Sequence, residues 1–228
     1  MIPRTLAHRL TQLAGAFPAV FLTGPRQSGK TTLARAAFPQ FQYISLEDMQ
    51  NRREAVEDPR GFLRRLEGQA AILDEIQRVP DLFSYLQGFV DESRGGPLVL
   101  TGSQHFLLSE KISQSLAGRV AILELLPFSL AELCGREALT PDSFMTPGPH
   151  VLHDPGLDLT ETLFTGFFPR IHDRGLEAPV WLDGYVRTYI ERDVHQVAGI
   201  GDMDPDGHPK SPTCGHLKIP HPASLIFQ

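Results

Sequence analysis

This sequence has few cysteines, no long apolar runs and no excess of positive charge. Its two cysteines, Cys134 and Cys214, lie far apart and have no His or Cys near them at ligand spacing. A disulfide scaffold is therefore excluded, a zinc site is disfavoured, and the composition is typical of a reducing compartment. We expect a cytoplasmic protein.

The other two absences bear on partners. Apolar runs are far shorter than the roughly 20 residues of a membrane-spanning helix, and the N-terminus has no apolar signal core. We expect no membrane partner. The net charge of −6 gives no chain-wide attraction to nucleic acid or acidic lipid. Five arginines between residues 52 and 65 alternate with acids, which favours a solvated helix face over a basic groove.

Short apolar runs and helical stretches alternate along the first 134 residues. Runs near residues 19–22, 43–46, 70–73, 98–100 and 120–125 are too short for helices and largely apolar on both faces, as in strands of a covered parallel sheet. Stretches with apolar residues at helical spacing separate them, with predicted caps at Asp58, before Pro59, and at Asp81. Ser129 and Glu132 have the spacing of a capping box. The pattern predicts an α/β fold, a doubly wound parallel sheet of about five strands followed by a small helical segment.

Composition shifts suggest the organisation of the chain. We expect an N-terminal helix in residues 1–16, a nucleotide-binding domain in 17–134, a Pro- and Gly-rich linker in 135–160, a helical segment in 161–202 and an irregular tail in 203–228.

Residues 24–31 match the phosphate-binding pattern G-x-x-x-x-G-K-[ST] at every fixed position, between an apolar strand and a helix. Gly24 and Gly29 allow tight turns and close approach of the backbone to phosphate oxygens. Lys30 is predicted to reach the β- and γ-phosphates, and the Thr31 hydroxyl to bind Mg²⁺. The predicted nucleotide-binding residues are Gly24, Pro25, Arg26, Gln27, Ser28, Gly29, Lys30, Thr31 and Thr32. We expect ATP and Mg²⁺ as ligands.

An acid pair follows the third apolar run, in the segment Ala70-Ala71-Ile72-Leu73-Asp74-Glu75. Carboxylates at the carboxyl end of a buried strand lie where α/β sheets bind ligands. Asp74 is predicted to hold the magnesium ion, and Glu75 to act as the general base that activates water.

Polar residues after the next strand are candidates to sense the γ-phosphate. Ser103 and Gln104 fit this role, and Thr101 is a weaker candidate; an ordinary polar turn fits equally well. Arg119 could stabilise transition-state charge as an arginine finger, although an ion pair at a strand entry is the simpler interpretation. Arg187 and Arg192 are weaker candidates for a sensor.

The order and spacing of these motifs resemble a known family. The phosphate-binding loop, "LDEIQRVP", "LTGSQ", "LAGRV" and "LLPFSLAEL" are similar to bacterial and archaeal AAA-type ATPases that carry a C-terminal domain of unknown function. The resemblance covers about residues 15–200. It implies that a glutamate follows the magnesium-binding aspartate, as Glu75 does, and that the strand before Ser103 lies between those before Lys30 and Asp74. It also implies possible assembly into homo-oligomers.

Members of that family usually continue, after a segment like Tyr189–Val194, into a winged-helix-like region. Residues 203–228 do not resemble this continuation, and we interpret them as a truncated or frameshifted C-terminal domain. Any contact with nucleic acid is implied only through that region.

The leading hypothesis is an ATPase that couples hydrolysis to a conformational change. A GTP switch is disfavoured because no N-K-x-D motif occurs. A small-molecule kinase and an ATP-binding regulatory module without hydrolysis remain as alternatives.

Overall fold

The computed structural model describes residues 2–92, 95–103, 116–136, 145 and 156–190. The chain divides into two compact units, Met1–Leu182 and Asp183–Gln228. The predicted tail and most of the predicted linker lie outside the described residues, as do Gln104, Arg192 and Cys214.

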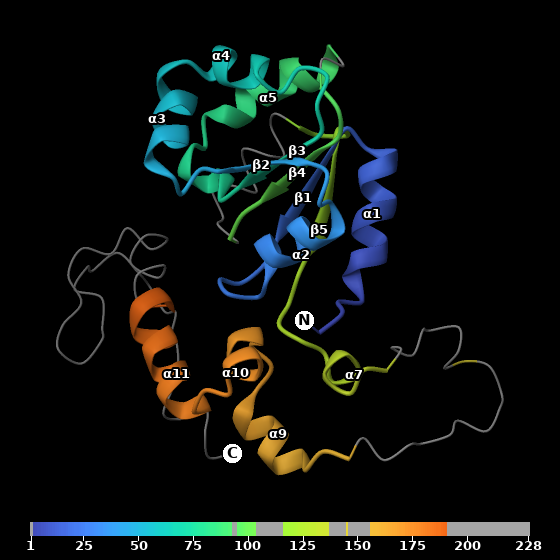
Figure 1. The fold of residues 1–228 in the computed structure, drawn as a ribbon, viewed down its shortest axis with the longest axis vertical. Helices are drawn as coiled ribbons and strands as arrows, with labels where there is room; N and C mark the ends of the chain where they lie inside the picture. The colour runs from blue at the N-terminus through green and yellow to red at the C-terminus, as the bar shows by residue number, and fades with distance from the viewer. Residues whose placement is uncertain (1, 93–94, 104–115, 137–144, 146–155, 191–228) are drawn as a thin grey trace, which may run out of the picture. The chain divides into compact units, whose positions relative to one another are not determined.

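A parallel sheet forms the centre of the first unit (Figure 1). Its order in the described residues is β2-β3-β4-β1-β5, with every neighbouring pair parallel. The strands are β1 (Ala19–Thr23), β2 (Gln42–Ser45), β3 (Ala71–Asp74), β4 (Leu98–Thr101) and β5 (Val120–Glu124). The predicted α/β fold with about five parallel strands is confirmed, and β4 lies between β1 and β3 as the family resemblance implied.

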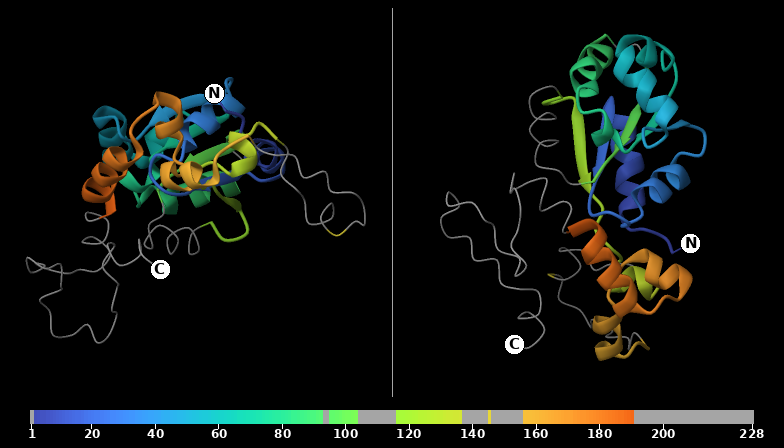
Figure 2. Two further views of the ribbon diagram at one scale, coloured as in Figure 1. Left: turned by 90° about the horizontal axis from the view of Figure 1, so that it is seen from below. Right: turned by 90° about the vertical axis from the view of Figure 1, so that its left-hand side faces the viewer.

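Helices cover both faces of the sheet (Figure 2). The first pair is α1 (Leu6–Ala16) and α2 (Lys30–Ala37); the other face carries α3 (Met49–Glu57), α4 (Pro59–Arg64), α5 (Leu82–Asp91) and the short η1 (Ile76–Arg78). The sheet is thus doubly wound, as parallel strands joined by helical crossovers require.

Alternation along each strand divides the apolar side chains between two cores. On β1, Phe21 belongs to the core beneath α3, α4 and α5, whereas Val20 and Leu22 belong to the core beneath α1 and α2. Successive side chains of a strand point to opposite faces, so a strand covered on both sides must be apolar at nearly every position. All five residues of β1 are buried.

Local capping explains where several helices begin. Asp58 accepts a hydrogen bond from the Gly61 amide, and Pro59 is the first residue of α4. Asp48 caps α3 in the same way. Asp81 also stands immediately before a helix, α5, but its side chain makes no cap hydrogen bond there, because its own backbone is already helical.

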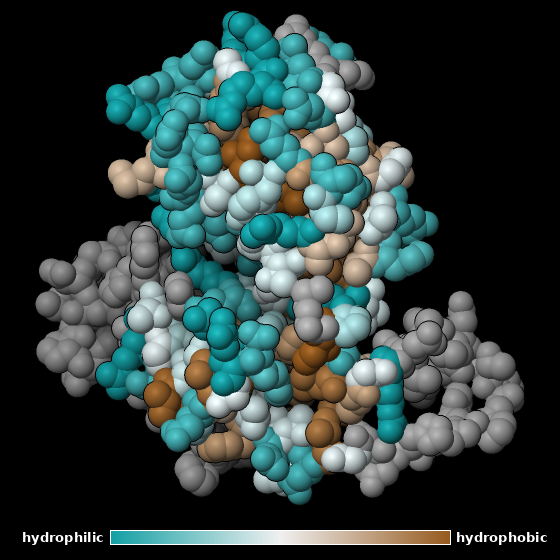
Figure 3. Space-filling model, in the orientation of Figure 1, coloured by the Kyte–Doolittle hydropathy of each residue, from teal (hydrophilic) through white to brown (hydrophobic). Residues whose placement is uncertain are grey.

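Further helices follow β5 in the described residues: α7 (Leu130–Leu133), α9 (Leu159–Thr165), α10 (Pro169–Arg174), α11 (Ala178–Tyr185) and η2 (Val186–Ile190). Hydrophobic side chains are visible among hydrophilic ones on the surface (Figure 3). On α9, Leu159, Leu163 and Phe164 are 67%, 64% and 66% exposed. No helix within the described ranges is long and apolar enough to cross a membrane.

Candidate nucleotide-binding site

Three segments that carry the predicted chemistry follow adjacent strands of the sheet. The loop at residues 24–29 follows β1, Glu75 follows β3, and Ser103 lies two residues beyond β4. Because β3, β4 and β1 are consecutive and parallel, their carboxyl ends lie at the same edge. That edge is where open α/β sheets bind ligands.

The loop itself has the backbone geometry that its glycines permit. Gly24 has a φ of +142° and Gly29 a φ of +95°. A Cβ on Gly24 would lie 2.2 Å from the carbonyl oxygen of Leu125, so the loop packs directly against the chain after β5. Gly29 precedes α2, whose first amides have no acceptor within the helix. These amides and the positive end of the helix make this a favourable position for an anion.

Lys30 is the first residue of α2, and its ammonium group lies back across the loop. It donates hydrogen bonds to the carbonyl oxygens of Gly24, at 3.0 Å, and Pro25, at 2.7 Å. Burial lowers the pKa of this ammonium group below its ordinary value, although the charges of Glu75 and Asp74 act in the opposite direction. An anionic phosphate beside it would favour the charged form further.

Asp74 is the centre of the polar network at the sheet edge. Its carboxylate is 4% exposed and accepts hydrogen bonds from three hydroxyl groups on three different elements. Thr31 donates at 2.9 and 3.1 Å, Tyr43 donates at 2.8 Å, and Thr101 donates to Oδ1. Thr31, the residue after Lys30, and Asp74, at the end of β3, are therefore in direct contact.

Glu75 has an unusual backbone conformation for its residue type. Its φ of +58° and ψ of +43° lie in the left-handed region, which is costly for a residue with a Cβ. Its amide donates to the Thr101 hydroxyl at 3.3 Å, and its carboxylate accepts a hydrogen bond from the Gln77 side chain. Such strain concentrates at functional sites, where the surrounding structure fixes it.

The other candidate residues from the sequence differ in burial and in hydrogen-bond partners. Ser103 is buried at the end of the segment after β4, and Thr32 is exposed on α2. Arg119 makes an ion pair with Asp91, to which its Nη2 donates at 3.0 Å. The simpler interpretation of Arg119 is thus the one that its contacts match. Arg187, in η2, pairs with Asp183, in α11.

The structure adds two residues that sequence reasoning missed. Tyr43, on β2, donates to Asp74; burial, followed by this hydrogen bond, raises the pKa of its phenol to about 12. Arg4, before α1, donates to the carbonyl oxygen of Ser28 in the loop at 2.8 Å. Neither residue belongs to a recognisable motif, because each reaches the site only through the fold.

The donor set fits a magnesium ion. Asp74 and Thr31 offer only oxygen atoms, the ligands that hard divalent cations prefer, and they already lie within hydrogen-bond distance of each other. A buried polar atom also fits a ligand in the loop: the Ser28 hydroxyl is fully buried and has no hydrogen-bond partner among the described residues. Buried hydroxyl groups ordinarily find a partner, and a phosphate oxygen would supply one.

Comparison with known proteins agrees with this geometry. A family model described as "AAA domain" matches residues 16–134, which include every strand of the sheet. The chain belongs to the AAA domain family. Uncharacterized proteins of Mycobacterium bovis and Mycobacterium tuberculosis are each 34% identical to it over 201 residues, or 85% of this chain. The chain spans 40% of the length of these two relatives.

Two solved ATPases are similar to this chain, and the first of them supports the assignment of its fold. A Walker-type ATPase of Pyrococcus abyssi superposes with a TM-score of 0.52 at 14% identity, covering 87% of this chain and 76% of the other. A signal-transduction ATPase with a tetratricopeptide repeat sensor from Pyrococcus horikoshii gives a TM-score of 0.40 at 16% identity, covering 63% and 27%. The fold is that of the P-loop ATPases, and at the level of the family the AAA domain binds nucleotide.

Proposed function

We propose that this AAA domain hydrolyses ATP to ADP and phosphate in a magnesium-dependent reaction. One observation carries the proposal: the Thr31 hydroxyl at the start of α2 contacts the Asp74 carboxylate, and Glu75 is the next residue in the chain. This arrangement at one edge of the sheet supports phosphate binding by the start of α2, metal binding by Asp74 and water activation by Glu75.

Each side chain then has a separate task. The loop amides from Gly29 onward bind phosphate oxygens, and Lys30 neutralises charge on the β- and γ-phosphates. Glu75 accepts a proton from the attacking water, because its carboxylate is only half-buried and lies beyond the end of β3. Ser103 is the described candidate for contact with the γ-phosphate.

Thr31 and Asp74 are the residues that would hold Mg²⁺. When bound, the ion neutralises developing charge on the phosphate oxygens. Tyr43 and Thr101 keep the Asp74 carboxylate in place through their hydroxyl groups.

The test measures nucleotide binding and phosphate release separately. Wild-type protein should release phosphate from ATP with magnesium and without any acceptor. Lys30→Ala should weaken ATP binding because it removes the only ammonium group described at the loop. Glu75→Gln should bind ATP normally while turnover falls by about 10²-fold or more, the usual contribution of a general base.

Glu57→Gln is the matched control, since Glu57 is exposed on α3 and pairs only with Arg53 among its described contacts. It should bind and hydrolyse ATP like wild type. Normal turnover by Glu75→Gln would overturn the assigned base. Phosphate transfer only to an added small molecule would favour the kinase alternative, and tight ATP binding without hydrolysis the regulatory module.

We also propose homo-oligomer formation, with ATP as the ligand that such an assembly would respond to. An arginine-finger role for Arg119 would then require its ion pair with Asp91 to break. Contact with nucleic acid, which the resemblance tied to a further C-terminal region, stays a prediction for the longer relatives.

A further inference from the structure

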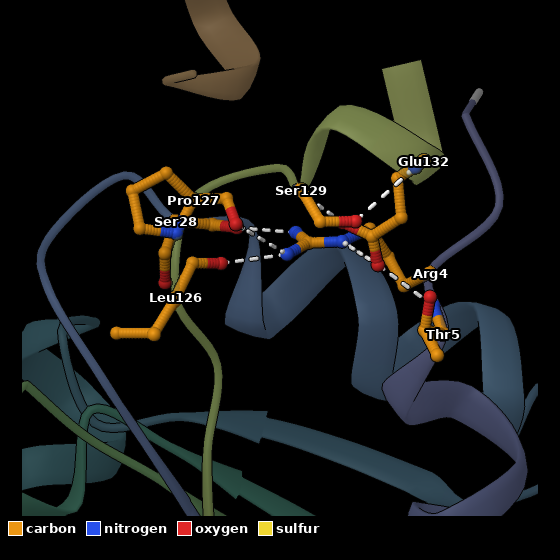
Figure 4. A network of polar contacts seen from close by, with 7 residues as sticks. All are labelled: Arg4, Thr5, Ser28, Leu126, Pro127, Ser129 and Glu132. Atoms are coloured by element: carbon orange, nitrogen blue, oxygen red, sulfur yellow. Dashed lines mark hydrogen bonds and ion pairs between the residues drawn. The ribbon is translucent and has the colours of Figure 1, made fainter. Parts of the chain in front are cut away.

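Arg4, which lies outside the recognised motifs, donates a hydrogen bond to the backbone of the loop at residues 24–29. Arg4 precedes α1, and its side chain lies among the loop, the chain after β5 and α7 (Figure 4). It is 8% exposed at the side chain, although it belongs to the N-terminal segment. Long charged side chains are rarely so buried without paired partners, and its partners are specific.

Four acceptors surround the guanidinium group. Nη1 donates to the Ser28 carbonyl oxygen at 2.8 Å, and Nη2 donates to the carbonyl oxygens of Leu126, at 2.6 Å, and Pro127, at 3.3 Å. Nε donates to the Glu132 carboxylate at 3.2 Å. A planar group with five N–H donors can satisfy acceptors in several directions at once, which an ammonium group on a flexible stem cannot do in the same geometry.

Glu132 fixes the position of Arg4 in turn. Its carboxylate also accepts from the backbone amides of Thr5, at 2.7 Å, and Ser129, at 2.9 Å. Burial by itself would raise the pKa of this carboxyl, but the two amides and the guanidinium outweigh burial and lower it. Glu132, on α7, is therefore held as an anion against the N-terminal segment, and this leaves Arg4 little freedom to move.

The contact with Ser28 has a consequence for the next peptide group. The Ser28–Gly29 peptide bond is trans, so the Gly29 N–H points opposite to the Ser28 carbonyl. Because that carbonyl is directed at Arg4, the Gly29 N–H is directed away from Arg4. The Gly29 carbonyl oxygen is fixed by a hydrogen bond from the Leu33 amide, at 2.9 Å. The φ of Gly29 is +95°, in a region that glycine adopts easily, so the preceding peptide group has more rotational freedom than it would beside another residue type.

We propose that Arg4 is a positioning residue for the phosphate cradle, holding the Ser28–Gly29 peptide so that the Gly29 N–H can donate to a nucleotide phosphate. This inference rests on the proposed nucleotide binding and adds a residue to it. Arg4 acts through the backbone, and its positive charge is already matched by Glu132, so its effect on affinity comes from orientation more than from attraction.

The sequence offers an unusually direct probe, because the dipeptide Ser-Gly occurs only at Ser28–Gly29. Protein labelled with ¹³C at the serine carbonyl and ¹⁵N at glycine gives a single carbonyl–amide correlation in NMR. That signal reports both the Ser28 carbonyl, which accepts from Arg4, and the Gly29 amide, which is proposed to donate to phosphate. In Arg4→Ala the carbonyl resonance should move upfield as its hydrogen bond is lost, and the response of the Gly29 amide to ADP should shrink.

Binding measurements complete the test at a temperature where every variant is folded. Arg4→Ala should raise the dissociation constants of ADP and of inorganic pyrophosphate by the same factor, about tenfold, because pyrophosphate contacts only the cradle. Arg4→Lys keeps the charge and should recover less than half of this loss on a logarithmic scale; it also decides the question if Arg4→Ala does not fold. Arg9→Ala is the control, since Arg9 is exposed on α1 and bonds to Gln12.

The outcomes are separable. If wild type binds neither ADP nor pyrophosphate, the proposed function fails and this inference with it. If wild type binds both, and the Arg4 variants melt at lower temperature yet bind pyrophosphate with unchanged affinity and an unchanged Gly29 response, Arg4 is merely structural and the inference alone is overturned.

Discussion

The hydroxyl group of Thr101 should contribute more to stability than its methyl group. Thr101 is fully buried at the end of β4. Its hydroxyl donates to the Asp74 carboxylate and accepts from the Glu75 amide at 3.3 Å. One atom thus fixes both acids of the candidate site, and Thr101→Val removes it while preserving the shape of the side chain.

The magnitude follows from these two contacts. A hydrogen bond to a charged group is worth about 1.5–3 kcal/mol, and the amide contact is long and adds little. The extra apolar surface of valine offsets part of this loss. We therefore expect Thr101→Val to lower the free energy of unfolding by about 2 kcal/mol and the melting temperature by about 4–8 °C for a chain of this size.

Thr101→Ser is the matched variant, since it keeps the hydroxyl and loses one methyl group, for a cost of about 1 kcal/mol. Urea denaturation of the three proteins gives the order wild type, serine, valine, from most to least stable. The Asp74 carboxylate and the Glu75 backbone amide lose their shared partner in the valine variant, so its ATP turnover should also fall. A valine variant as stable as wild type, or more stable than the serine variant, would refute the reasoning.

Three further predictions follow from single contacts. Gly24→Ala should destabilise the fold by about 2–4 kcal/mol, because its Cβ would meet the Leu125 carbonyl oxygen at 2.2 Å in a strained backbone conformation. Thermal unfolding without nucleotide measures this change, and an unchanged melting temperature would contradict the prediction. Tyr43 should ionise at high pH, because its pKa is raised to about 12. Its contribution to stability is therefore complete below pH 10 and is lost as the pH rises toward 12. An ultraviolet titration of wild type should show this high-pH step, and Tyr43→Phe should lack it. Glu132 has a lowered pKa, so its contribution to stability is complete above the ordinary value of 4.5 and is lost as the pH falls through the lowered pKa. Glu132→Gln should therefore flatten the dependence of stability on pH below 4.5, and an unaltered acid transition would count against these contacts.

Much of the fold was predictable because its signals are local. Strands covered on both faces must be apolar throughout, so short runs such as Ala19–Thr23 stand out in the sequence. Helix starts were readable where a side chain caps its own helix, as at Asp58 and at Ser129 with Glu132. The prediction of a cap at Asp81 was wrong, because sequence spacing does not fix the backbone angles that a cap needs.

The candidate site, like the fold, was predictable from the sequence only in part. The loop at residues 24–31 was readable because its residues are contiguous and each type has a distinct backbone or charge requirement. Asp74 and Glu75 were readable because they directly follow a buried strand. The left-handed conformation of Glu75 was not, since nothing in its neighbours requires it.

What the sequence by itself determined is the chemistry available: a glycine-rich loop with a lysine, an acid pair after a strand, and apolar runs that can only be a covered sheet. What only the tertiary structure decided is which distant side chains support that chemistry. Tyr43 and Thr101 meet at Asp74, and Arg4 reaches Ser28, because sheet order and helix packing bring them there. Contacts between residues 24 to 31 positions apart depend on how every intervening element packs, and no local pattern records them.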